Sequence, residues 1–163
     1  MSFYGKYRGE VVSNLDPMMQ GRVQVTVPAV FGDERMAWAD PCAPFAGNGV
    51  GFFSLPPVGA QVWVEFEGGD PDHPIVAGGF WGLGEVPGDG LPTTTVLKTG
   101  SITLTLSDLP GGGGLTIEVN PPAVVSPIKL AMTSSGIEMT VGASKISVGL
   151  ASVSVNDGAL EVI

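Results

Sequence analysis

The sequence predicts an all-β protein, on two observations. Glycine and proline together make up roughly a quarter of the chain, with 25 glycines and 14 prolines among 163 residues, and both residue types are unfavourable inside helices. No window places apolar residues at i, i+3, i+4 and i+7, whereas alternation of apolar and polar residues recurs throughout. That alternation is the pattern of half-buried strands, so we expect strands and turns along the whole chain.

Residues 1–90 predict a small closed barrel with the size and strand count of an OB-fold. Clusters of asparagine, aspartate, glycine and proline separate the alternating runs, as turns separate strands. Five or six strands are expected, at 7–12, 21–28, 38–43, 60–67 and 75–79, with 52–55 as the sixth. Closure into a barrel removes exposed sheet edges, so this half is expected to fold as one domain.

Residues 91–163 predict a second domain built from short repeats. Runs of two or three apolar residues at period two recur roughly every 7–9 residues, each followed by a small or polar corner. The apolar side chains of one chain are too few and too small to fill the interior of a helix built from such repeats, and the edges of its strands stay unpaired. Three copies solve both problems, so we expect an intertwined trimeric β-helix, a β-prism needle. Its expected core positions are Ile137, Met139, Val141, Ile146, Val148, Val153, Val155, Leu160 and Val162.

The role of residues 109–128 in this needle stays open. The glycine run at 111–114 predicts either a flexible hairpin tip or an insertion loop beside the barrel. It does not predict a phosphate-binding loop, because no Lys-Ser or Lys-Thr pair follows it.

The composition excludes several classes of partner and site. The net charge is −9, which argues against nucleic acid and anionic membranes as partners. Only 14% of residues are charged and the mean hydropathy is +0.33, so we expect another chain to cover much of the surface. The single cysteine, Cys42, excludes an internal disulfide and is expected to be a buried, inert thiol. No secretory leader and no 18-residue apolar run occur, so folding in a cytoplasm is expected.

Catalytic and metal sites are weakly indicated. Glu65 and Glu67 lie two apart on a predicted strand and would share one face, as a pair of catalytic carboxylates must. A solvent-facing role explains them better, because Val62, Val64 and Phe66 alternate with them. The oxygen-rich segment 70–73 could hold a cation, yet its flanking prolines favour a turn. We therefore expect no enzyme activity, no cofactor and no metal.

Aromatic residues are concentrated in the first half and suggest an alternative function. Aromatic side chains on a small barrel can stack single-stranded nucleic acid. They come without a basic groove, since the basic side chains of residues 1–90 are Lys6, Arg8, Arg22 and Arg35. Packing within the barrel or against another copy explains them better. The alternative hypothesis is an OB-fold module that binds an oligonucleotide or oligosaccharide and carries a trimerising stalk.

Two stretches of the first half resemble a known family. The run Gly9-Glu10-Val11-Val12, the Asp16-Pro17 turn and the segment 21–28 resemble the start of its OB-fold. Residues 56–76 follow its ordered pattern P-x-x-G-x-x-V-x-V-x-F-E-x-G-D-P-x-x-P-x-V. The family is that of the central spikes of contractile injection systems, which includes phage baseplate assembly protein V, the T-even phage spike and the VgrG proteins. The matched motif positions include Gly21, Arg22, Val23, Gly59, Phe66, Gly69, Asp70, Pro71 and Pro74.

The resemblance implies a homotrimeric spike in which an OB-fold collar precedes a needle that pierces the target-cell envelope. A separate tail hub protein is expected at the barrel end, since no hub domain precedes the barrel here. The only histidine, His73, lies in the barrel, so a histidine metal site at the needle tip is not expected. The apolar end at Leu160, Val162 and Ile163 favours capping by a PAAR-type tip protein. Such a part is assembled in the bacterial cytoplasm and ends in a phage virion or a phage tail-like particle.

Overall fold

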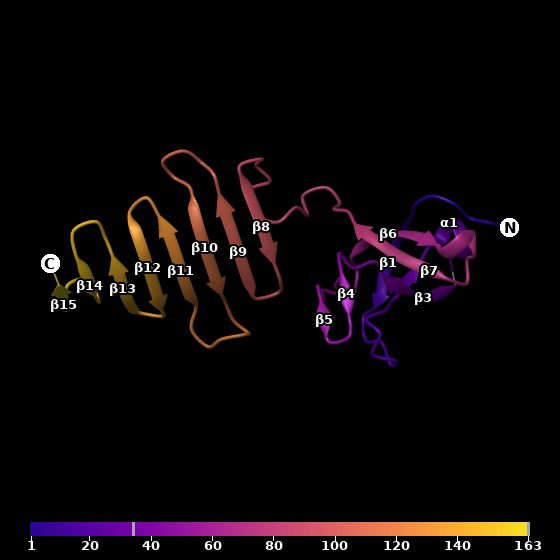
Figure 1. The fold of residues 1–163 in the computed structure, drawn as a ribbon, viewed down its shortest axis with the longest axis horizontal. Helices are drawn as coiled ribbons and strands as arrows, with labels where there is room; N and C mark the ends of the chain where they lie inside the picture. Colours follow the sequence, from indigo (N-terminus) through magenta and orange to yellow (C-terminus); the bar gives the residue numbers. More distant parts are fainter. Residues whose placement is uncertain (34, 163) are drawn as a thin grey trace. The chain divides into compact units, whose positions relative to one another are not determined.

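A computed structural model describes residues 1–33 and 35–162 of the chain (Figure 1). The chain divides into two compact units, one spanning Met1–Glu85 and the other beginning at Val86. Helical structure in the described part is confined to α1 (Pro28–Phe31) and the 3-10 turn η1 (Glu67–Gly69). The all-β prediction is therefore confirmed. No described helix has the length and hydrophobicity that a membrane span requires.

The first unit is a closed five-stranded barrel with the strand order β1-β2-β3-β7-β6. Neighbouring strands run antiparallel, except that β3 and β7 are parallel. The strands are β1 (Tyr7–Ser13), β2 (Val23–Thr26), β3 (Met36–Pro41), β6 (Gln61–Phe66) and β7 (Pro74–Gly79). The predicted barrel is thus confirmed, and its closure leaves no strand of this sheet with an open edge.

The barrel core is filled by alternate residues of its strands. Along β6 every second side chain is buried, and β2 follows the same pattern. The fully buried set is mostly valine, which suits a narrow barrel interior, and consists of Val11, Val23, Val25, Val27, Ala39, Val62, Val64 and Phe66. At one end the Phe66 ring contacts the rings of Tyr7 and Phe31, at centroid distances of 5.6 and 5.7 Å. The core is therefore complete within one chain.

Some predicted details of the first unit are wrong. The segment 52–55 is not a strand. The chain instead forms a small hairpin of β4 (Ala46–Gly47) and β5 (Val50–Gly51), which the Phe52 N–H closes by donating to the Phe45 carbonyl at 3.1 Å. Cys42 is exposed rather than buried, because it follows the end of β3. Its backbone N–H still donates to the Val76 carbonyl, at 3.1 Å.

Two further differences concern helical turns. Pro28 was expected to end a strand, but it begins α1, where its fixed φ and missing N–H suit the first helical position. Glu67 was expected on the same strand as Glu65, but β6 ends at Phe66 and Glu67 begins η1. The two carboxylates therefore do not share a strand face, and the arrangement proposed for a catalytic pair is absent.

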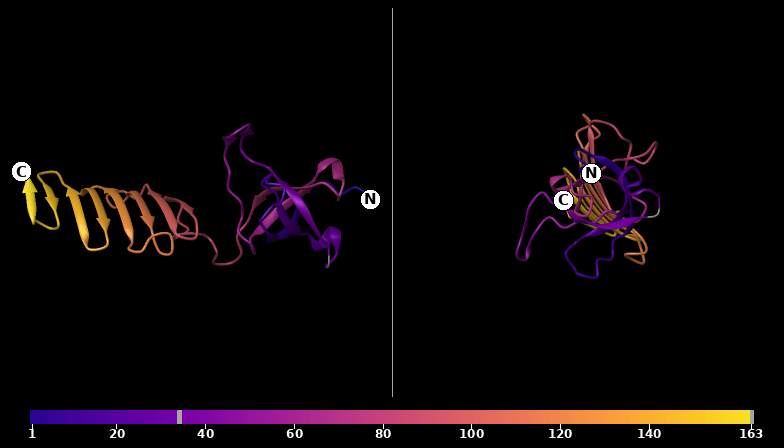
Figure 2. Two further views of the ribbon diagram at one scale, coloured as in Figure 1. Left: turned by 90° about the horizontal axis from the view of Figure 1, so that it is seen from below. Right: turned by 90° about the vertical axis from the view of Figure 1, so that its right-hand side faces the viewer.

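The second unit is one antiparallel sheet of eight strands in the order β15-β14-β13-β12-β11-β10-β9-β8. Each strand pairs with the next along the chain, so the sheet is a meander whose strands follow one another like rungs (Figures 1 and 2). The strands are β8 (Thr94–Lys98), β9 (Ile102–Ser107), β10 (Gly114–Val119), β11 (Ile128–Thr133), β12 (Gly136–Val141), β13 (Ser144–Val148), β14 (Val153–Val155) and β15 (Leu160–Val162).

The segment 109–128 belongs to this sheet. Its glycine run forms the turn between β9 and β10, where the N–H groups of Gly112 and Gly113 both donate to the Leu109 carbonyl, at 3.2 and 2.7 Å. Strand β10 then pairs with both β9 and β11 over its whole length. Of the two alternatives, the hairpin tip is therefore correct.

Gly136→Ala should destabilise the sheet, because Gly136 opens β12 with a φ of 127° and a Cβ there would run into the Val148 carbonyl oxygen. We expect the free energy of unfolding to fall by about 1–3 kcal/mol, the usual cost of such backbone strain. Calorimetric unfolding of the purified protein measures this.

The matched control is Gly100→Ala, at a glycine with ordinary φ and no atom within 4 Å of the added carbon. Its unfolding midpoint should not move. Equal effects of the two substitutions would contradict the role given to Gly136.

Candidate interaction surfaces

One face of the second unit is apolar across the whole sheet, and we call it the apolar face. Direct cross-strand partners in an antiparallel sheet point to the same side, so the register places side chains in rows. The central row crosses all eight strands through Leu97, Leu104, Ile117, Leu130, Met139, Ile146, Val155 and Leu160. A second row contains Leu106, Leu115, Met132, Ile137, Val148, Val153 and Val162. A third contains Ile102, Val119, Ile128 and Val141.

Within the described part of the second unit, no other layer covers the apolar face. Among the described residues of the second unit, the one buried hydrophobic side chain is Ala131, which lies on the other face. Met139, in the middle of the central row, keeps 52% of its surface exposed. A contiguous apolar surface of this extent is unusual for a monomer and marks an interaction site.

The nine residues expected to form the needle core all lie on the apolar face. Sequence reasoning missed its first half, on β8, β9, β10 and β11. The signal was present there, because Ile102, Leu104 and Leu106 alternate with threonine in the same way.

The opposite face of the sheet is polar. Threonine and serine dominate it, with ion pairs between cross-strand neighbours. The Lys129 ammonium lies 3.2 Å from the Glu118 carboxylate, and that of Lys145 lies 3.2 Å from Glu138. The sheet therefore has one face suited to water and one that must be covered.

Lys145 holds the last hairpin, β14–β15, against the rest of the sheet. Its ammonium contacts the Asp157 carboxylate at 2.8 Å in addition to Glu138. Its backbone N–H donates to the Asn156 side-chain oxygen, and the Asn156 N–H donates back to the Lys145 carbonyl, both at 2.8 Å. The turn of this hairpin is thus tied to β13 through both side-chain and backbone groups.

The residues expected to meet a tip protein lie at the edge of the sheet. Leu160 and Val162 belong to β15, the last strand, and both are exposed. Strand β15 pairs with β14 alone, so its other edge is open. Ile163 lies outside the described residues.

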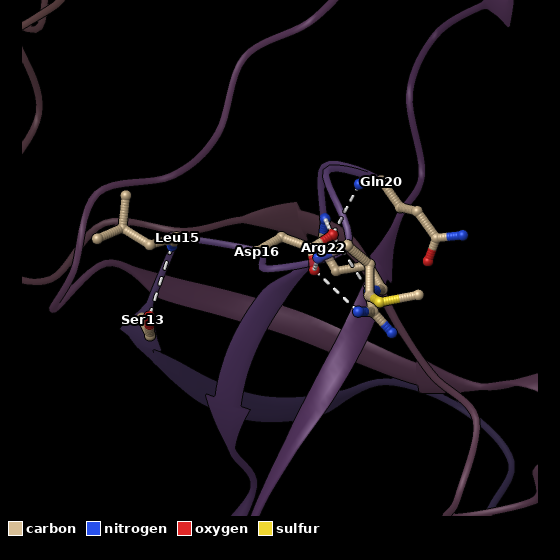
Figure 3. A network of polar contacts seen from close by, with 6 residues as sticks. Ser13, Leu15, Asp16, Gln20 and Arg22 are labelled. Carbon is tan, nitrogen blue, oxygen red and sulfur yellow. Dashed lines mark hydrogen bonds and ion pairs between the residues drawn. The ribbon is translucent and has the colours of Figure 1, made fainter.

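In the first unit, the Asp16 carboxylate organises the loop that precedes β2 (Figure 3). It accepts two hydrogen bonds from the Arg22 guanidinium, at 2.8 and 3.2 Å. It also accepts the N–H groups of Met18 and Gln20, at 3.0 and 2.8 Å, and that of Arg22. Its side chain is only 3% exposed. The Arg22 hydrogen bonds, helped by the backbone N–H groups, hold the pKa of Asp16 far below its usual range, although burial acts in the opposite direction.

The remaining motif residues before η1 support the same barrel. Val23 and Phe66 are buried in its core. Arg22 also lies over the Trp38 ring, at 5.6 Å from its centroid. Gly21 lies against the Phe53 ring, and Gly59 occupies the turn before β6, where its N–H donates to the Val11 carbonyl.

The motif residues after β6 form the turn into β7. Gly69 has a φ of 81°, and a Cβ there would press on the Tyr4 ring at 3.0 Å. Asp70 accepts the Asp72 N–H at 3.0 Å, and its carboxylate lies 3.3 Å from Nδ1 of His73. Pro71 lies in this turn, and Pro74 is buried at the start of β7. The motif therefore shapes the barrel, and the structure brings its members together as two turns rather than as one cleft.

Two of the carboxylates considered for catalysis or metal binding are paired with basic side chains. Glu65 bonds Lys6 at 2.7 Å, and Asp72 bonds Arg35 at 2.5 Å. Within residues 1–33 and 35–162, no group of three or more His, Cys, Asp or Glu side chains could hold a metal ion.

Arginine side chains cover several aromatic rings of the barrel, whereas Phe45, Phe52, Phe53 and Trp81 are exposed. The Arg8 guanidinium lies 5.0 Å from the Trp63 ring centroid and 4.4 Å from that of Phe80. Trp38 is covered by Arg22. These faces are occupied within the chain, which disfavours base stacking there.

Asp16→Asn should lower the free energy of unfolding of the barrel at neutral pH and flatten its dependence on acid. The pKa of Asp16 is lower in the folded barrel than in the unfolded chain. Its ionisation therefore favours folding above the ordinary value of about 3.9, and this contribution is lost as the pH falls below it. Denaturant unfolding followed by tryptophan fluorescence reports on the barrel, since Trp38, Trp63 and Trp81 all lie in the first unit.

Asp108→Asn, at an exposed carboxylate of the second unit, is the control and should keep the acid dependence of the wild type. Parallel loss of stability with acid in wild type and Asp16→Asn would show that Asp16 does not supply it.

Lys145→Met should loosen the last hairpin without unfolding the sheet. Exposed ion pairs contribute about 0.2–1 kcal/mol each, so amide hydrogen exchange across 153–162 should quicken about two- to fivefold. Lys129→Met removes one ion pair in mid-sheet and serves as control. Exchange at 153–162 that is the same in both variants would refute the role of Lys145.

The two units match two family descriptions. Residues 7–81 match the type VI secretion system/phage-baseplate injector OB domain, and residues 94–161 match the phage baseplate V C-terminal trimerisation domain.

Curated relatives are similar to about half of the chain. It is 35% identical over 86 residues to the actin cross-linking toxin VgrG1 of Vibrio cholerae, covering 48% of this chain and 8% of that protein. It is 37% identical over 82 residues to the type VI secretion system spike protein VgrG4b of Pseudomonas aeruginosa, covering 50% and 10%. It is 34% identical over 86 residues to the spike protein VgrG3 of Vibrio cholerae, covering 48% and 8%.

The chain spans about a tenth or less of the length of these relatives. The two domain matches follow one another in the order in which the structure places the barrel and the sheet. The chain therefore belongs to the family of type VI secretion system and phage-baseplate injector proteins, and it carries their OB domain followed by the trimerisation domain.

Proposed function

We propose that this chain is the structural central spike of a contractile tail or injection-system baseplate and works as a homotrimer. The observation that carries the proposal is the apolar face, which spans the sheet from β8 to β15 and has no cover within the described residues of the second unit. Three such sheets, with their apolar faces turned inward, make a three-sided prism. The match to a trimerisation domain supports the number three.

Burial of the apolar face supplies the driving force. Each large aliphatic side chain gives about 1.5–3 kcal/mol when it leaves water, so a full face on each of three chains gives tens of kcal/mol before entropy is subtracted. Eight strands at a spacing of about 4.8 Å make a prism on the order of 35 Å long. Its outer surface is the polar face, which lets it pass an envelope without adhering to lipid.

The proposed partners follow from the ends of the spike. A separate tail hub protein holds the barrel end, and a PAAR-type tip protein covers the open edge of β15. The exposed Leu160 and Val162 beside that edge support this assignment. The envelope of the target cell is met during contraction, after assembly in the bacterial cytoplasm.

The proposed role is mechanical rather than enzymatic. The motif residues serve the fold, and of the carboxylates considered for chemistry Glu65 is paired with Lys6 and Asp72 with Arg35. The alternative, an OB-fold module for oligonucleotides or oligosaccharides, has less support because Arg8 and Arg22 cover the rings of Trp63, Phe80 and Trp38. The exposed rings of Phe45, Phe52 and Phe53 lie in a segment without basic side chains, which a nucleic-acid backbone would require. Titration of the purified protein with labelled single strands and glycans should give no specific binding. Specific micromolar binding would favour the alternative.

Met139→Glu should abolish the trimer, because three carboxylates would have to enter the apolar interior without partners. Native mass spectrometry should show wild type near three times the 16.7 kDa chain and the variant as monomer. Thr140→Glu adds the same charge one residue along on the polar face and should remain trimeric. A monomeric wild type, or a trimeric Met139→Glu variant, would overturn the proposed assembly.

A further inference from the structure

The barrel carries an extended arm, residues 42–55, with the β4–β5 hairpin at its tip. Figure 2 shows it projecting from the barrel. Its base is tied down by the bond from the Cys42 N–H to the Val76 carbonyl, and its tip is closed by the bond from Phe52 to Phe45. The arm is therefore an ordered projection of the barrel.

The chemistry of the arm is unlike that of a solvent-facing loop. No charged side chain occurs between Asp40 and Glu65. The exposed large apolar side chains include Phe45, Phe52, Val50 at 68% and Phe53 at 77%. Loops normally carry polar residues at such positions, so this surface fits an apolar partner.

A second apolar surface of the barrel lies on the loop before β2. Leu15 is 84% exposed and Met19 is 91% exposed, with Met18 beside them. Leu15 and Met19, together with Phe53 and Leu55, border an open depression. The loop is held by the Asp16 network, so the surface is formed before any partner arrives. Methionine side chains adapt to the shape of an incoming apolar group.

We propose that the tip of each arm packs on the 15–19 loop of the next copy in the trimer. This inference rests on the proposed trimer. The segment 80–93, which joins the two sheets, can span at most about 50 Å. Trimerisation of the second unit therefore holds the three barrels at an effective concentration in the millimolar range, where even a weak contact is occupied.

The proposed partner is a second copy because each chain carries both apolar surfaces, the tip of the arm and the 15–19 loop. The base of the arm, at Phe53 and Leu55, borders the depression beside the 15–19 loop, whereas the tip of the arm is the β4–β5 hairpin. A contact between the tip of one copy and the 15–19 loop of another joins two different surfaces, so it is head-to-tail rather than two-fold. Such contacts close into a ring when the rotation allows it, and a trimer sets the rotation at a third of a turn. Each barrel then donates one arm and receives one, and no apolar tip stays in water.

The test is photocrosslinking of the full chain with p-benzoylphenylalanine incorporated at Val50. Irradiation of the purified trimer should give covalent dimers and trimers, with the crosslink mapped by mass spectrometry to residues 15–19 of another copy. Adding Met19→Glu should reduce the yield about tenfold, because an unpaired carboxylate resists transfer into an apolar contact. The probe placed at Asp72, on the turn before β7, is the control and should give no such product.

The outcomes separate this inference from the trimer itself. A species of trimer mass with no crosslink between copies from position 50 would overturn the arm contact and leave the spike intact. Crosslinking from position 50 to a different baseplate protein in assembled particles, but not between copies, would also overturn it. A monomeric wild-type protein would remove the proposed trimer on which the contact depends.

Discussion

The register of the second sheet brings every second side chain into rows that cross eight strands on one face. A one-residue slip at any strand would move its apolar side chains to the polar face. The register that aligns the apolar rows therefore also creates the face that needs a partner. The sheet cannot fold over itself to cover the rows, since neighbouring strands lie side by side in a single layer. Cover must come from outside this sheet.

The barrel has no such need for its core. Its valines and Phe66 fill an interior formed by one chain, and hydrogen bonds to the Asp16 carboxylate hold the loop before β2 in place. The two units therefore depend on assembly to different degrees. In the proposed trimer, folding of the sheet would depend on association and so on protein concentration, whereas the barrel fills its core within one chain.

Much of this organisation could be predicted from the sequence, because alternation is a local signal. The barrel strands, the buried Val62, Val64 and Phe66, and the repeated strands after residue 136 all follow from it. Features decided by contacts distant in sequence could not be predicted. Apolar and polar residues alternate only weakly in residues 52–55. This segment does not join the barrel sheet, and Phe52 instead closes the hairpin by its bond to Phe45. Glu67 continues the alternating pattern of β6, yet the chain turns at Gly68 and Gly69, so Glu67 belongs to η1 rather than to the strand. The position of residues 109–128 follows from the pairing of β10 with both β9 and β11, which could not be predicted from the sequence.

The strand pairing also bears on the proposed mechanical role. The stiffness of a trimeric needle can come from ladder bonds between chains or from ladder bonds within each chain. In the structure the ladder runs within each chain, from β8 to β15 along the sheet. In the proposed prism, a force along the axis would be carried from strand to strand by bonds of the same chain, while the apolar rows would resist sliding of one sheet past another. Local hairpins form quickly because their contacts are close in sequence, and burial against the other two faces would then stabilise each sheet. Stiffness and assembly thus draw on different interactions, the backbone ladder for the first and side-chain burial for the second.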